Sequence, residues 1–137
     1  MSIDLDFRYD DNIDERQHSS DDIMNIVELY ISKLNELVEL PLNFNIFVFE
    51  KSSVNSTPDV TKDGIHILIN IQMDYNEKII LRNMIIDEIS NIWNDIPITN
   101  TWSDVFDEGV IKGSVNWQLF GSRKPGNKAY ELSYYFT

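Results

Sequence analysis

The chain has 137 residues, no cysteine and a formal net charge of −12. This length is that of a single domain, and the lack of cysteine excludes disulfides and thiolate metal sites. The net charge argues against a general nucleic-acid binder, because phosphate contacts dominate such affinity. The acidic start excludes a secretory signal, and no apolar run is long enough to span a bilayer. We therefore expect a soluble, intracellular protein without a membrane partner.

The charge is unevenly spread along the chain. Residues 1–28 carry nine acidic side chains against two arginines, whereas residues 109–137 carry four basic side chains and one acid. An acidic beginning and a basic end, folded together, would make a metal site beside a phosphate site. The alternative is a solvated acidic surface that only keeps the protein in solution, and we expect this for most of the charges.

In chain order, the first half predicts a strand, a helix and a strand. Residues 3–9 alternate as a strand does, and residues 10–20 are a polar loop. A helix follows, with Ser20 as its N-cap, and its apolar residues recur at helical spacing as far as Val38. Residues 44–49 are apolar and aromatic, which predicts the second strand.

The middle of the chain predicts a loop, a strand and a second helix. Residues 51–62 have the composition of a flexible loop, and residues 65–71 that of a buried strand. A capping box at Asp74 opens a helix that runs to Trp93. Residues 94–104 are a turn-rich connection.

The end of the chain predicts two more strands, at residues 117–120 and 130–136, joined by a Gly/Pro/Lys loop at residues 121–128. The whole pattern predicts an α+β fold. We expect an antiparallel or mixed sheet of the ferredoxin-like kind, with helices packed on one face.

The first strand carries an acidic motif, because Asp4 and Asp6 alternate with Leu5 and therefore share one face. Two carboxylates on one face are costly unless a cation or another partner neutralises them. A third carboxylate, Asp107, brought alongside would make an all-oxygen site suited to Mg²⁺ or Mn²⁺. The alternatives are a chance Asp-x-Asp in a chain with 23 acids, and an ordinary turn-opening role for Asp107.

The second motif is His66, which lies between two isoleucines in the predicted strand at residues 65–71. One interpretation is a half-buried histidine with a structural partner. The other is an imidazole that hydrogen-bonds a phosphate oxygen of a bound nucleotide, with Gly64 leaving room for that ligand on the same face. We assign no role to His18, which lies in a polar loop.

The third motif is the loop at residues 121–126, which holds Arg123 and Lys124 between small residues. Such a loop can wrap an anion with backbone N–H groups and side-chain charge. It lacks the spacing of a Walker loop. An ordinary hairpin with a basic tip is an equally good interpretation of this segment alone.

Four segments of the chain, taken in sequence order, resemble the archaeo-eukaryotic primase superfamily. The resemblance is strongest to the primase part of the helicase–primases of poxviruses and giant DNA viruses. The segments are residues 3–9, 62–67, 105–110 and 116–125. They match an acidic hhhDhD motif, a small-x-His motif, an hD motif and a basic tail, where h is a hydrophobic residue. The likeness spans residues 3–136.

The resemblance implies that Asp4, Asp6 and Asp107 are catalytic residues that hold two divalent ions, Mg²⁺ or Mn²⁺. It implies that His66 contacts the phosphates of the incoming nucleotide. It also places Arg123 and Lys124 near the triphosphate or the template.

For the chain as a whole, the resemblance implies one primase-like catalytic domain over residues 1–137, with an RRM-like or ferredoxin-like core. We expect the chain to lack the family's N-terminal segment and any helicase domain. The implied function is a metal-dependent nucleotidyltransferase that makes or extends primers for DNA replication. It would use NTPs or dNTPs on a single-stranded DNA template, in the cytoplasm or a viral replication compartment, with a separate helicase subunit as a candidate partner.

Two other functions stay open. One is a truncated, non-catalytic module that binds nucleotide or docks a helicase. The other is a metal-dependent nuclease, since three carboxylates also serve hydrolysis.

Overall fold

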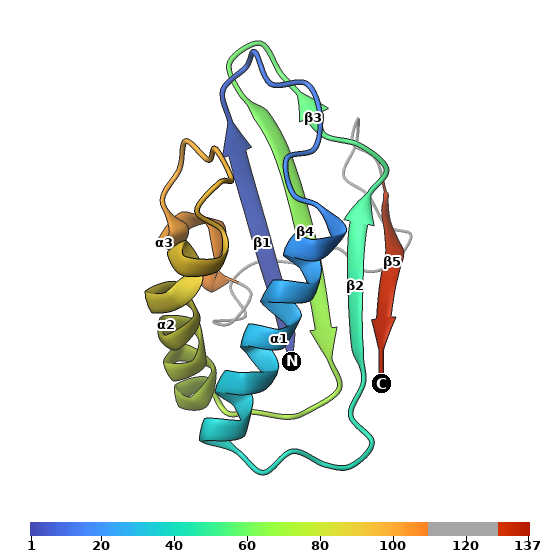
Figure 1. Ribbon diagram of the computed structural model, residues 1–137, viewed down its shortest axis with the longest axis vertical. Helices are drawn as coiled ribbons and strands as arrows, with labels where there is room; N and C mark the ends of the chain where they lie inside the picture. The colour runs from blue at the N-terminus through green and yellow to red at the C-terminus, as the bar shows by residue number, and fades with distance from the viewer. Residues whose placement is uncertain (110–128) are drawn as a thin grey trace.

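An antiparallel sheet of five strands, with helices on one face, makes up the fold in a computed structural model that describes residues 1–109 and 129–137 (Figure 1). The strand order is β1-β4-β2-β5, and the short β3 pairs with β4. The strands are β1 (Ser2–Tyr9), β2 (Ile46–Lys51), β3 (Asn55–Ser56), β4 (Thr61–Ile69) and β5 (Tyr130–Phe136). The helices are α1 (Ser20–Leu37), α2 (Tyr75–Ile92) and α3 (Trp102–Val105).

The core lies between the sheet and the two long helices. Because side chains alternate along a strand, every second residue of β1, β2 and β4 points into the core, as Leu5, Val48 and Ile65 do. They pack with apolar residues of α1 and α2, such as Ile26 and Ile85, which are fully buried. The opposite face of the sheet is therefore left for other roles. In the described part of the chain, no helix is both long enough and apolar enough to cross a bilayer.

The two long helices begin at capping boxes. The second begins as predicted, after Asp74, whose side chain accepts from the backbone N–H of Glu77 at 2.8 Å. The first is capped by Ser19, one residue before the predicted Ser20, because the reciprocal partner Asp22 lies three residues after Ser19.

The predicted α+β fold with helices on one face is confirmed, and two strands differ from the prediction in extent. Strand β2 covers Ile46–Lys51 rather than residues 44–49. Strand β4 covers Thr61–Ile69 rather than residues 65–71, because residues 61–68 pair with β1 even though the first of them are polar. Strand β3 and helix α3 lie in segments predicted as irregular, and both are too short for a periodic pattern. The predicted strand at residues 117–120 and the loop at residues 121–128 lie outside the described residues.

Candidate functional site

The two aspartates of β1 lie on the face of the sheet that turns away from the helices. Burial alternates along the strand, so Leu5 and Phe7 are fully buried against the helices while Asp4 and Asp6 are partly exposed. The apolar residues thus anchor the strand, and the same periodicity presents both carboxylates on the open face, as the sequence predicts.

His66 lies next to Asp4 on this open face. Strands β1 and β4 are antiparallel, and their register puts Asp4 directly opposite His66. Nε2 of the imidazole is 3.2 Å from Oδ1 of Asp4. On its other side the imidazole stacks on the ring of Tyr130 from β5, with ring centroids 3.7 Å apart and an interplanar angle of 14°. The imidazole is therefore held in one orientation by a carboxylate and an aromatic ring.

Asp107 joins the free edge of β1 beside Asp4. An isolated antiparallel bridge pairs Leu5 with Phe106, and the backbone N–H of Asp107 donates to the carbonyl oxygen of Asp4 at 3.1 Å. The Asp107 carboxylate accepts from the N–H of Gly109 at 2.8 Å. The structure therefore brings Asp107, Asp4 and His66 together on three adjacent backbone segments.

The three carboxylates lie near one another but do not converge. Burial raises the pKa of Asp6, and the charges of Asp4 and Asp107 raise it further, against the lowering effects of Arg8 and Lys62. Within residues 1–109 and 129–137, no group of three or more His, Asp or Glu side chains is arranged to hold a metal ion. Each carboxylate instead has its own neighbour, and mutual repulsion favours this separation.

The donor set nevertheless suits a hard divalent cation. Asp4, Asp6 and Asp107 offer carboxylate oxygens, the ligands that Mg²⁺ and Mn²⁺ prefer. Burial and the charges of Asp4 and Asp107 together raise the pKa of Asp6 more than Arg8 and Lys62 lower it. A bound cation would relieve that uncompensated negative charge.

Replacing Asp6 with asparagine should stabilise the metal-free protein at neutral pH. A folded-state pKa above 3.8 means that ionisation of Asp6 lowers stability as pH rises through that range. The gain should be a few tenths of a kcal/mol, since the side chain is 43% exposed. It should vanish below about pH 3, where the carboxyl is protonated in both states.

Urea denaturation of Asp6→Asn and wild type at the two pH values, with a chelator present, measures this difference. A variant that is less stable than wild type at pH 7 would contradict the electrostatic account of Asp6.

The space over Gly64 is filled by Tyr130 rather than left for a ligand. A Cβ added at Gly64 would lie 2.5 Å from the Tyr130 hydroxyl and 3.2 Å from the carbonyl oxygen of Leu5. Gly64 is opposite Asp6 in the register, so the hydroxyl lies beside the acidic residues. Glycine is favoured at this position because the tyrosine approaches the backbone so closely.

Gly64→Ala should therefore destabilise the protein by about 1.5 kcal/mol, because overpacking forces the tyrosine to move. The double variant Gly64→Ala/Tyr130→Phe should recover part of this loss, since it removes the atom that the new methyl group meets first. Chemical denaturation of the two single variants and the double variant measures the coupling. Strict additivity of the two changes would show that Tyr130 does not impose the glycine.

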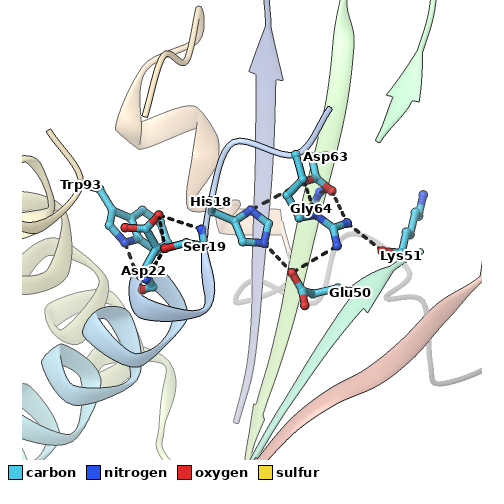
Figure 2. A network of polar contacts seen from close by, with 9 residues as sticks. His18, Ser19, Asp22, Glu50, Lys51, Asp63, Gly64 and Trp93 are labelled. Atoms are coloured by element: carbon cyan, nitrogen blue, oxygen red, sulfur yellow. Dashed lines mark hydrogen bonds and ion pairs between the residues drawn. The ribbon is translucent and has the colours of Figure 1, made fainter. Parts of the chain in front are cut away.

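Sequence analysis missed a buried polar network on the helix side of the sheet, around His18 (Figure 2). Nε2 of His18 is 2.5 Å from Oε2 of Glu50, and its Nδ1 is 3.6 Å from Oδ2 of Asp63. The guanidinium of Arg16 donates twice to the Asp63 carboxylate, at 2.8 and 2.9 Å, and once to the carbonyl oxygen of Lys51 at 2.7 Å. The network ties the loop before α1 to β2 and β4.

The charges in this network stabilise one another. Although burial opposes it, hydrogen bonds from His18 and Ser133 and the charges of His18 and Arg16 hold the pKa of Glu50 below its usual value. One signal in the sequence was available: Glu50 alternates with Ile46 and Val48 on the buried face of a strand. A carboxylate at such a position needs a partner.

A small cavity borders the candidate site at the edge of β1, among Asp4, Lys78, Arg82 and Asp107. Its volume is about 20 Å³, which is room for a water molecule or two and far too little for a nucleotide. The predicted phosphate-binding residues Arg123 and Lys124 lie outside the described part of the chain.

Comparisons with known proteins give the family of the chain. A model of the N-terminal AEP domain of C962R proteins matches residues 1–136, and AEP denotes archaeo-eukaryotic primase. The chain is also 32% identical over 139 residues to a putative helicase, L207/L206, of Acanthamoeba polyphaga mimivirus. The match covers 98% of this chain and 14% of that relative, so the chain spans about one seventh of the relative's length.

Proposed function

The chain belongs to the family of C962R-type N-terminal AEP domains, and hence to the archaeo-eukaryotic primases, and we propose that it is the catalytic core of a metal-dependent primase. It would join NTPs or dNTPs into primers, or extend them, on a single-stranded DNA template. The observation that carries the proposal is the juxtaposition of Asp107, Asp4 and His66 on adjacent backbone segments. The family match supports our assignment of nucleotidyl-transfer chemistry to this cluster.

In this proposal Asp4, Asp6 and Asp107 hold two Mg²⁺ or Mn²⁺ ions. Such ions, when bound, supply charge stabilisation at the triphosphate and activate the attacking 3′-hydroxyl. The protein's own task is then to position the reactants, which accounts for a site without a serine or cysteine nucleophile.

His66 is the group that we propose for contact with the triphosphate. Its ring is held by Tyr130 at 3.7 Å and by Asp4 at 3.2 Å, and its side chain is only 5% exposed. Contact with a phosphate oxygen therefore requires the Tyr130 ring or the Asp4 carboxylate to move aside. Arg123 and Lys124 are proposed to add positive charge near the triphosphate or the template, on the strength of the family pattern alone.

The length of the mimivirus relative suggests what the primase core works with. Since that relative is named as a putative helicase and is about seven times as long as the aligned region, we propose that the primase core works with a helicase, on the same chain or on a separate subunit. The proposed place of action is the replication compartment of an infected cell.

A primer-synthesis assay tests the proposal. The 137-residue chain is incubated with single-stranded DNA, a labelled primer or none, nucleotides, and Mg²⁺ or Mn²⁺. The expected result is strand lengthening that stops when a chelator is added. Nucleotide binding without lengthening would favour a non-catalytic module, and shortening of the labelled strand would favour a nuclease. Either result would reject the proposed polymerising activity.

A further inference from the structure

Arg82 of α2 forms hydrogen bonds with the segment that carries Asp107. Its Nε donates to the carbonyl oxygen of Phe106 at 2.9 Å, and its Nη2 donates to that of Ser103 at 2.8 Å. Its Nη1 lies 3.5 Å from Oε1 of Glu108. The side chain is 11% exposed, so water competes little for these contacts. One guanidinium therefore holds the chain on both sides of Asp107.

The contact with Phe106 is the important one, because the carbonyl of Phe106 and the N–H of Asp107 belong to the same peptide group. That N–H donates to the carbonyl oxygen of Asp4 on β1. A peptide group is planar and rigid, so α2 fixes one end of it and β1 fixes the other. This double attachment fixes the position of the Asp107 Cα, from which the side chain extends.

We propose that Arg82 is the positioning residue for Asp107, holding its peptide group against β1 so that its carboxylate stays beside Asp4. The inference rests on the proposed function, in which Asp107 is a metal ligand. Arg82 contacts two backbone carbonyls and Glu108, so it acts on the site through the segment that carries Asp107. The fork of the guanidinium is essential, because it reaches two carbonyls at once, which a lysine ammonium on a single flexible stem does poorly.

Arg82→Lys is the test variant, and Lys33→Met is the matched control. Lys33 also makes a charged contact with α2, 2.6 Å from Oε1 of Glu88, but that contact lies between α1 and α2. Hydrogen exchange of the Asp107 amide should become about tenfold faster in Arg82→Lys, since its peptide group is attached at one end only. Exchange at this amide should not change in Lys33→Met.

A second readout is Mn²⁺ affinity, measured by titration of the protein without nucleotide. The dissociation constant should rise about tenfold in Arg82→Lys and stay unchanged in the control, as expected when a group that orients a ligand is lost. In the synthesis assay, a higher Mn²⁺ concentration should restore most of the rate. If Arg82→Lys does not fold, Glu108→Gln removes one partner of the guanidinium and should shift both readouts in the same direction, by less.

Unchanged exchange at the Asp107 amide in Arg82→Lys would overturn the proposal. Faster exchange with unchanged Mn²⁺ affinity would also overturn it, because Arg82 would then order the segment without serving the site. Failure of the proposed primase function would be distinguishable from failure of the Arg82 proposal, because the wild-type protein itself would then neither bind Mn²⁺ nor lengthen a strand. The amide exchange would still decide whether Arg82 holds Asp107.

Discussion

Replacing Asp107 with alanine should reduce primer synthesis by about a thousandfold, the loss expected when a group that stabilises transition-state charge is removed. The fold should survive, because Asp107 is attached to β1 through its backbone N–H, which alanine keeps. Its carboxylate also raises the pKa of Asp6, so removal of this charge relieves repulsion in the metal-free protein. Synthesis is measured by primer extension, and folding by circular dichroism.

Asp104→Ala is the matched control for this prediction. Asp104 is an exposed aspartate of α3, three residues before Asp107. Its backbone N–H donates to the side-chain oxygen of Thr101, and alanine would keep this hydrogen bond. It should keep wild-type synthesis. If Asp107→Ala retains more than about a tenth of wild-type activity, Asp107 is not a ligand of an essential ion.

Replacing Asp63 with asparagine should destabilise the protein by about 3 kcal/mol, because it removes one carboxylate of a buried ion-pair network and leaves Arg16 with Glu50, 3.4 Å away, as its remaining acidic partner. The Asp63 side chain is 0% exposed and receives two hydrogen bonds from Arg16, at 2.8 and 2.9 Å. Asparagine keeps the shape and can still accept from the N–H of Gly64, so the loss reports the charge together with the second acceptor oxygen that faces Arg16. In a chain of this size the melting temperature should fall by about 10 °C.

Asp59→Asn makes the same chemical change at an exposed position just before β4. Its effect should stay within about 0.5 kcal/mol, as for most surface substitutions. Urea denaturation of both variants at pH 7 gives the comparison. Equal stabilities for Asp63→Asn and Asp59→Asn would show that the network around His18 contributes nothing to the folded state.

Local patterns in the sequence predict those features that depend on neighbouring residues. The alternation of Asp4 and Asp6 with Leu5 is a property of one strand, so the open-face position of the acids follows from periodicity alone. The helix that starts after Asp74 follows from a capping box within four residues. The family resemblance likewise depends on short motifs, and the match over residues 1–136 confirms it at the level of the superfamily.

Contacts between distant segments are not encoded in any local pattern. The partner of Asp4 on the sheet is His66 because β1 and β4 pair in one register, and a shift of one residue would turn His66 to the core. The attachment of Asp107 depends on a bond from a segment with no strand pattern of its own.

The same holds for the partners that sequence analysis did not find. Tyr130 fills the space over Gly64 from a strand on the far side of β2, and His18 meets Glu50 across 32 positions of the chain. Short-range propensities set which residues form strands and helices and which way their side chains face. The register between strands, and hence which side chains meet, is set by how the whole sheet buries its apolar face against α1 and α2.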